Sequence, residues 1–238
     1  MASERERWLS AFHAANPGVT RRAWARGGSY ARVAARVVDA VGAGARVLDL
    51  ACGDGALLEH LGPRAIGLDL SAAELALAGG AVIQGRAQAL PFAGGVFDAA
   101  ACHLAFMLFD EIEDVVGELA RVLRPDAPFV ALLGGGPTAD GDDAFHTVAR
   151  AVPCSEVRFG DRRASSEAGW RELFAGWGTI TFERWPIDLG GAFADVWSFL
   201  ATSYQLRDGE RVRDLVRAAF PGEHVPLTVV TYLATVRR

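Results

Sequence analysis

One nine-residue stretch constrains the fold of this chain more than any other. Residues 47–55 read VLDLACGDG, in which an apolar run containing one acid leads into a turn with Gly53 and Gly55. This order is typical of a buried strand that ends in a tight loop and opens a helix. In an open parallel sheet, such a loop lies at the carboxyl edge, where ligands bind.

Strands and helices alternate around this loop. Their spacing of roughly 20–30 residues is typical of a parallel sheet wound with helices on both faces. Ser71 is predicted to cap a helix, with Glu74 at capping-box spacing. The other predicted strands are 64–70, 81–84, 96–102 and 129–133, and the helices between them are 56–61 and 110–123.

The pattern differs at both ends of the chain. Helical spacing is predicted for residues 3–15 and 29–41, with an irregular basic stretch, 16–28, between them. After residue 137 the alternation stops. Short helices are expected at 144–152 and 166–176, a helical segment at 192–220, and two late strands at 179–189 and 227–237. With neither an internal repeat nor a linker, one domain is expected over 1–238.

Composition excludes several classes of function. The net charge of −5 gives no reason to expect a nucleic-acid partner. All 24 basic residues are arginine, which excludes a P-loop lysine, a Schiff-base lysine and a lysine base. Three cysteines at unrelated spacings form no disulfide framework or zinc site, and no pair of the five histidines has metal spacing. We therefore expect no metal.

The location is expected to be cytoplasmic. The cysteine pattern favours a reducing compartment, and the charged N-terminus, MASERERWLSAF, lacks the apolar core of a signal peptide. Residues 90–109 are long and apolar, but Gly94 and Gly95 interrupt them. A turn, a buried strand and a helix start are predicted there rather than a membrane span.

Charge separates the ligands that suit the loop. Asp69 falls 14 residues after Gly55, where an acid can accept hydrogen bonds from the ribose hydroxyls of an adenosyl ligand. Asp49 and Asp54 flank the turn and would repel a pyrophosphate by several kcal/mol. The glycines also miss the G-x-G-x-x-G spacing of dinucleotide sites. The sulfonium and ammonium groups of S-adenosylmethionine would instead be attracted.

Four stretches in series resemble one family. They are VLDLACGDG at 47–55, GLDLS at 67–71, QALPFAGGVFDAAACH at 88–103 and ELARVLRPDAPFVAL at 118–132. Together they resemble the class I (Rossmann-like) S-adenosylmethionine-dependent methyltransferases, in particular the type 11 group acting on small molecules. The resemblance implies an α/β fold with a doubly wound, seven-stranded, mostly parallel sheet of order 3-2-1-4-5-7-6, whose last strand is antiparallel.

The resemblance also implies a division of the chain and a set of loop residues. Residues 1–44 would form an N-terminal helical lid, 45–136 the cofactor-binding core, and 137–238 the substrate-side cap segments with the last two strands. The family motif assigns the methionine part of S-adenosylmethionine to Asp49, Ala51, Gly53 and Gly55, and Cys52 lies in the same loop as a small residue that permits close approach.

Further cofactor contacts are implied outside the loop. Asp69 would bind the ribose and Leu70 the adenine, while Ala87 and Gln88 would border the adenine edge. His103 would lie near the methionine moiety, and Tyr30 would close over its carboxylate end. The chain departs from the family at Arg86, where an acid often takes the adenine amino group and where arginine cannot accept a hydrogen bond.

The proposed roles of the remaining residues stay open. His103 is a candidate base or a neutral hydrogen-bonding group, and His146 is a candidate general base in a region where the family lines its substrate pocket. Pro153-Cys154, far past the fifth strand, is disfavoured as a nucleophile pair. Trp197, Phe199 and Tyr204 are expected in the core or a pocket wall, and the basic cluster Arg21, Arg22, Arg26 with Trp24 on a solvated lid face.

Three functions are compatible with these observations to different degrees. The favoured one is a metal-independent methyltransferase for a small-molecule acceptor, using S-adenosylmethionine and releasing S-adenosylhomocysteine, as a monomer or homodimer. The runner-up is a non-catalytic relative that acts as a partner subunit, and Arg86 is the residue that supports it. A nicotinamide dehydrogenase is disfavoured by glycine spacing and loop charge.

Overall fold

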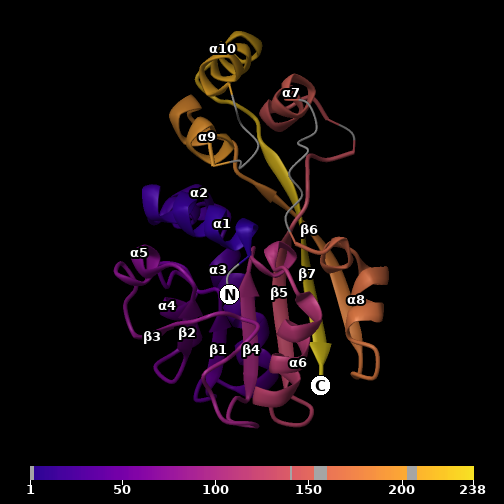
Figure 1. Ribbon diagram of the computed structural model, residues 1–238. Helices are drawn as coiled ribbons and strands as arrows, with labels where there is room; N and C mark the ends of the chain where they lie inside the picture. The colour runs from indigo at the N-terminus through magenta and orange to yellow at the C-terminus, as the bar shows by residue number, and fades with distance from the viewer. Residues whose placement is uncertain (1–2, 140, 153–159, 203–207) are drawn as a thin grey trace.

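The sheet has the predicted strand order. In the computed structural model, which describes residues 3–139, 141–152, 160–202 and 208–238, the described strands form one sheet of order β3-β2-β1-β4-β5-β7-β6 (Figure 1). β7 runs antiparallel to β5 and β6, and the pairs among β1 to β5 are parallel. The strands are β1 (Val47–Leu50), β2 (Ile66–Asp69), β3 (Ala81–Gln84), β4 (Ala99–His103), β5 (Pro128–Gly134), β6 (Ile180–Asp188) and β7 (Thr228–Arg237).

Helices cover both faces of the sheet. Side chains alternate along a strand, so Val47 faces α3 (Ser29–Val41) and α4 (Leu58–Leu61), while Leu48 faces α6 (Ile112–Val122). α8 (Glu167–Leu173) completes this second layer together with the short helices η1 (Phe106–Leu108) and η2 (Arg162–Ser165). The buried strands explain why the first one reads as a continuous apolar run.

A group of cap helices stands above the carboxyl edge of the sheet (Figure 1). These are α7 (Ala144–Ala151), α9 (Phe193–Leu200) and α10 (Gly209–Ala219), which share an apolar cluster with the ends of β6 and β7. The single helical segment predicted for 192–220 is thus seen as two helices, and Trp197 and Phe199 belong to their cluster. Tyr204, Pro153 and Cys154 lie outside the described residues.

The segment 3–41, for which the name lid is kept, contains one helix that the sequence analysis did not predict. α1 (Glu4–Ala15) lies where a helix was expected, but the stretch 16–28 contains α2 (Val19–Trp24) instead of irregular chain. A six-residue helix is too short to display a periodic pattern, and packing stabilises it instead. Trp24, only 8% exposed, contacts Phe199 and His103 edge-on.

The long apolar stretch at 90–109 forms a turn, β4 and η1, as predicted. None of the described helices has the length and apolar character needed to cross a membrane.

Candidate functional site

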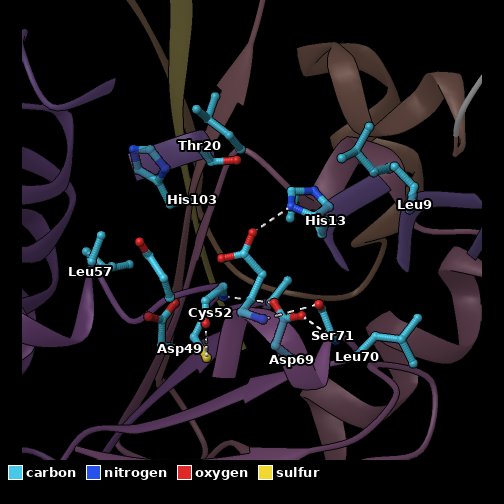
Figure 2. A pocket seen from close by; sticks show the side chains of 18 of the residues that line it. Leu9, His13, Thr20, Asp49, Cys52, Leu57, Asp69, Leu70, Ser71 and His103 are labelled. Atoms are coloured by element: carbon cyan, nitrogen blue, oxygen red, sulfur yellow. Dashed lines mark hydrogen bonds and ion pairs between the residues drawn. The ribbon is translucent and has the colours of Figure 1, made fainter. Parts of the chain in front are cut away.

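A cavity lies at the carboxyl ends of β1, β2 and β4, beneath the lid helices (Figure 2). Counted with its open mouth, it encloses about 850 Å³. A second cavity of about 390 Å³ shares Ala51, Asp69 and Leu70 with it. Most of the predicted site residues line one cavity or both: Tyr30, Asp49, Ala51, Cys52, Gly53, Asp69, Leu70, Ala87, Gln88 and His103.

Asp69 holds the glycine loop in place. Its Oδ2 atom accepts a hydrogen bond from the Gly53 N–H at 2.8 Å, and its Oδ1 atom accepts one from the Ser71 N–H at 2.8 Å. The loop backbone is left-handed at Ala51 (φ 58°) and Gly53 (φ 54°). Burial raises the pKa of the Asp69 carboxyl, although both N–H groups oppose this shift. The same side chain therefore shapes the loop and faces the cavity.

Close approach explains the small residues around the loop. A Cβ atom on Gly67 would lie 2.6 Å from the Cys52 Sγ atom and 2.9 Å from the Leu58 Cδ1 atom. Cys52 is a buried free cysteine, and burial raises the pKa of its thiol. A raised thiol pKa disfavours the nucleophilic thiolate, so Cys52 acts here as a packing residue.

This contact predicts a specific loss of stability. Replacing Gly67 with alanine is expected to lower the free energy of unfolding by about 1–3 kcal/mol, because the added methyl group overpacks the junction of β2 and the loop. Gly79→Ala is the matched control, since a Cβ atom there meets nothing within 4 Å. Urea unfolding measures both, and equal midpoints for the two variants would contradict the prediction.

Asp49 carries a buried carboxylate that no described residue meets with a hydrogen bond. It is 1% exposed, lines the larger cavity, and neither oxygen has a partner among the described residues. Burial raises its pKa well above the ordinary value, and the nearby charge of Asp69 adds to the shift. A carboxylate held in this way is matched by a ligand that brings a positive, hydrogen-bonding group, such as an ammonium.

The sequence analysis treated Asp49 and Asp54 as two unpaired acids, but Asp54 is paired in the structure. Its Oδ2 atom lies 2.8 Å from the Arg21 Nε atom, and the Arg21 Nη2–H donates to the Asp54 carbonyl oxygen at 3.0 Å. Arg21 also pairs with Glu59 at 2.7 Å. The sequence analysis missed the Arg21–Asp54 pair because Arg21 lies in α2, a helix that it did not predict. Arg26 also binds backbone carbonyls, so the basic cluster is not simply a solvated face.

His103 is a buried, neutral wall of the cavity. Its Nε2 atom lies 2.9 Å from the Ser29 Oγ atom, and its ring stacks on Tyr30 with centroids 4.0 Å apart. Burial lowers its pKa to about 3. So weak a base favours the hydrogen-bonding role over proton abstraction. Burial also raises the pKa of Tyr30, which stays protonated beside it.

His146 does not line either cavity. It lies in the first turn of α7, where its Nδ1 atom is 2.7 Å from Asp143 Oδ1 and its Nε2 atom is 2.9 Å from the Thr138 carbonyl oxygen. The bond to Asp143 raises the His146 pKa. These contacts make His146 part of a helix cap, which the sequence analysis did not recognise.

The sequence analysis missed, among other lining residues, a polar pair in the larger cavity, His13 and Glu74. The His13 Nδ1 atom lies 2.8 Å from Glu74 Oε1, and the Gly18 N–H donates to Glu74 Oε2 at 3.0 Å. Glu74 is 3% exposed. Ser71 caps α5 (Ala72–Leu75) as predicted, but the Glu74 carboxylate binds the lid. The spacing of Glu74 from Ser71 is that of a capping box, which by itself explains an acid at this position. Nothing in the sequence therefore indicated that Glu74 contacts the lid.

Comparisons with known proteins agree with this geometry. Residues 48–131 match the sequence profile of the family described as Methyltransferase domain. The chain is 36% identical over 101 residues to demethylmenaquinone methyltransferase of Thermus thermophilus, a region that covers 37% of this chain and 46% of that protein. It is 38% identical over 89 residues to malonyl-(acyl-carrier protein) O-methyltransferase of Enterobacter lignolyticus, covering 34% and 36%.

These alignments are partial, since each spans less than half the length of the curated relative. The fold likeness extends further. The crystal structure of the YcgJ protein from Bacillus subtilis superposes with a TM-score of 0.61 at 21% identity, covering 87% of this chain and 98% of that one. Residues 48–131 are thus similar in sequence to a methyltransferase domain, and the superposition shows that the chain shares the fold of that solved structure.

Proposed function

We propose that this protein is a methyltransferase that uses S-adenosylmethionine to methylate a small molecule without a metal ion. The carrying observation is Asp49, a buried carboxylate that lines the cavity and whose two oxygens find no hydrogen-bond partner in the part of the chain that the structure describes. Such a group fits a cationic amino-acid moiety and disfavours a phosphate. The relatives named for demethylmenaquinone and malonyl-(acyl-carrier protein) support an acceptor of small-molecule type.

Different residues around the two cavities would bind different parts of S-adenosylmethionine. Asp49 and the loop at Gly53 would hold the methionine part, Asp69 the ribose hydroxyls, and the second cavity, next to Leu70, the adenine. Together with Asp54 and Glu74, Asp49 and Asp69 surround the larger cavity with carboxyl groups. This excess of acids suits a ligand whose net charge is positive.

Most of the catalytic work would be alignment. When bound, S-adenosylmethionine supplies a methyl group on a positively charged sulfur, which is a good leaving group. The loop and lid would fix the positions of the reacting atoms, and such alignment can contribute on the order of 7–11 kcal/mol. The buried, neutral His103 and the protonated Tyr30 would exclude water from one side. The acceptor atom is oxygen, nitrogen or carbon.

The cap helices α7, α9 and α10 would form the substrate side. Trp24 and Phe199 are buried and contact each other in the apolar cluster that these helices share. A partly apolar acceptor is therefore proposed. Arg86 was the residue that supported a non-catalytic partner subunit. Its side chain forms an ion pair with Glu6, which explains an arginine here without that alternative.

Calorimetric titration tests the cofactor assignment. Wild-type protein is expected to bind S-adenosylmethionine and S-adenosylhomocysteine with micromolar affinity, and Asp69→Ala to weaken both by tenfold or more, about 1.4 kcal/mol. The reason is the loss of the ribose acceptor and of the loop anchor at Gly53. Asp39→Ala, an exposed acid of α3, is the control. Folded wild-type protein that binds neither ligand would refute the assignment.

A further inference from the structure

The second cavity combines apolar walls with a few polar side chains. Its apolar walls include Leu68, Leu70 and Phe109. Besides Asp69, which it shares with the larger cavity, three polar side chains line it: Glu6 from the lid, and Arg86 and Gln88 from the segment after β3. Apolar walls with a few placed polar groups are typical of a specific ligand site, in which the polar groups decide which ligand is accepted.

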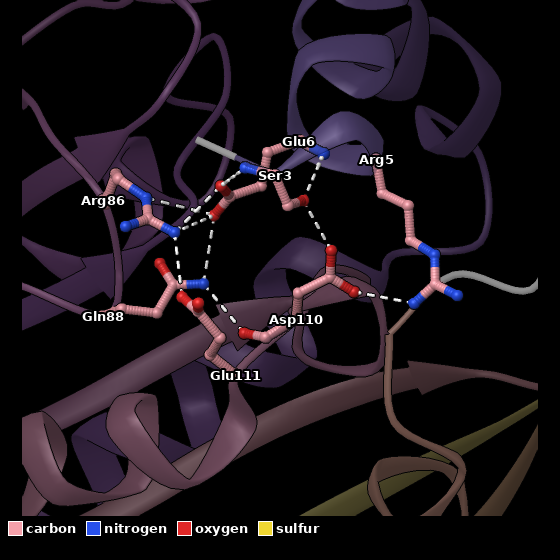
Figure 3. Close-up of polar contacts among 7 residues, drawn as sticks. All are labelled: Ser3, Arg5, Glu6, Arg86, Gln88, Asp110 and Glu111. Atoms are coloured by element: carbon pink, nitrogen blue, oxygen red, sulfur yellow. Dashed lines mark hydrogen bonds and ion pairs between the residues drawn. The ribbon is translucent and has the colours of Figure 1, made fainter. Parts of the chain in front are cut away.

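The orientation of the Gln88 amide is fixed by its neighbours. Its Nε2 atom donates to Glu6 Oε1 at 3.1 Å and to the Asp110 carbonyl oxygen at 2.8 Å (Figure 3). Both partners are acceptors only, so the amide nitrogen must face them and both of its hydrogens are used. The hydrogen bonds found for Gln88 in the described part of the chain all use Nε2. Its amide oxygen is the end left to meet a ligand.

Glu6 is held in turn by Arg86. The Arg86 Nη2–H donates to Glu6 Oε1 at 3.0 Å and to Oε2 at 2.9 Å, and the Ser3 N–H donates to Oε2 at 2.8 Å. The Glu6 side chain is 12% exposed. These donors occupy the Glu6 carboxylate, so it orients Gln88 instead of meeting the ligand itself. Glu111 also pairs with Arg86, at 3.1 Å, but its side chain is 56% exposed.

We infer that Gln88 is the residue that selects adenine, and that Glu6 and Arg86 are its positioning residues. The 6-amino group of adenine is a donor and pairs with the Gln88 amide oxygen, whereas the 6-oxo group of hypoxanthine would face that oxygen with a second acceptor. Because Glu6 belongs to α1, base selection depends on the lid as well as on the core. This inference rests on the proposed function, since it assumes that the base of S-adenosylmethionine enters this cavity.

The test compares two probes that differ only at the 6-position of the base. S-adenosylhomocysteine and S-inosylhomocysteine are titrated calorimetrically into wild type, Glu6→Gln and Glu111→Gln. Wild type is expected to prefer the adenine probe by at least tenfold, because a site built around one hydrogen-bond pattern rejects the reversed pattern. In Glu6→Gln the new side chain can present its NH₂ group to Gln88, so only one of the two orienting acceptors, the Asp110 carbonyl oxygen, remains, and the preference is expected to fall to threefold or less.

Glu111→Gln is the matched control. It removes the same charge from the same guanidinium but leaves Gln88 bound to Glu6, so the tenfold preference is expected to persist. Both probes are measured on one sample, so partial unfolding lowers the binding stoichiometry and leaves the preference unchanged. Equal binding of the two probes by wild type, or an equal loss of preference in both variants, would overturn the inference while the proposed function stands. No binding of either probe by folded wild type would overturn both.

Discussion

Replacing Asp49 with asparagine is expected to stabilise the ligand-free protein and to weaken binding of S-adenosylmethionine by tenfold or more. The gain in stability follows from burial: the Asp49 carboxylate is 1% exposed and has no hydrogen-bond partner among the described residues. The loss of affinity follows because asparagine carries no charge to attract the ammonium group. A single substitution thus moves stability and binding in opposite directions, as at sites that carry strain for function.

The gain in stability depends on pH with a definite sign. The pKa of Asp49 is raised in the folded protein, mainly by burial. Folded protein therefore holds this proton over a pH range in which unfolded chain has lost it, and stability falls as the pH rises above about 4, the ordinary value for aspartate. Asparagine has no such proton to lose. The advantage of Asp49→Asn is expected to grow from pH 5 to pH 8.

Urea unfolding at pH 5 and pH 8, with calorimetry on the same samples, measures both effects. Asp39→Asn serves as the control, since Asp39 is an exposed acid of α3 and its removal is expected to change unfolding by less than about 0.5 kcal/mol. A variant that is less stable than wild type at pH 8 would show that Asp49 has a native partner. Unchanged affinity would separate Asp49 from the ligand.

The core of the fold was predictable because each of its signals is local. β3 (Ala81–Gln84) has its predicted bounds, and β5 (Pro128–Gly134) extends one residue beyond the predicted 129–133 at each end. Continuous apolar runs, glycine turns and the amphipathic α6 each express a structure within a few residues. The order of the strands came from the resemblance and is confirmed by the pairing of β7 between β5 and β6.

The contacts of the lid were not predictable, because they join residues far apart in the chain. α2 is too short for a periodic pattern, and the pairing of its Arg21 with Asp54 appears only once the chain is folded. The same holds for Arg86, which looked like a defect in the adenine site and binds Glu6, 80 residues away. His146 was singled out by residue type, but its contacts are those of a helix cap.

The lid's attachment to the core gives the second large prediction. Glu74 binds the His13 ring and the Gly18 N–H from a position that is 3% exposed. Glu74→Ala would leave both groups without this acceptor, and an unsatisfied buried group costs about 1–3 kcal/mol. We expect a lower free energy of unfolding by that amount, faster hydrogen exchange of the α1 amides, and faster dissociation of S-adenosylhomocysteine, because His13 and Glu74 line the cofactor cavity.

Glu59→Ala is the comparison that separates burial from charge. Glu59 also pairs with a lid residue, Arg21 at 2.7 Å, but its side chain is 56% exposed. An exposed ion pair contributes about 0–1 kcal/mol, so this variant is expected to keep near-normal exchange of the α1 amides and dissociation of the probe. If Glu74→Ala and Glu59→Ala speeded α1 exchange and probe dissociation equally, the overall charge attraction between lid and core, and not the burial of Glu74, would hold the lid in place. If only Glu74→Ala does so, the lid depends on one buried acceptor, and opening of the cavity requires that acceptor to give up His13 and Gly18 together.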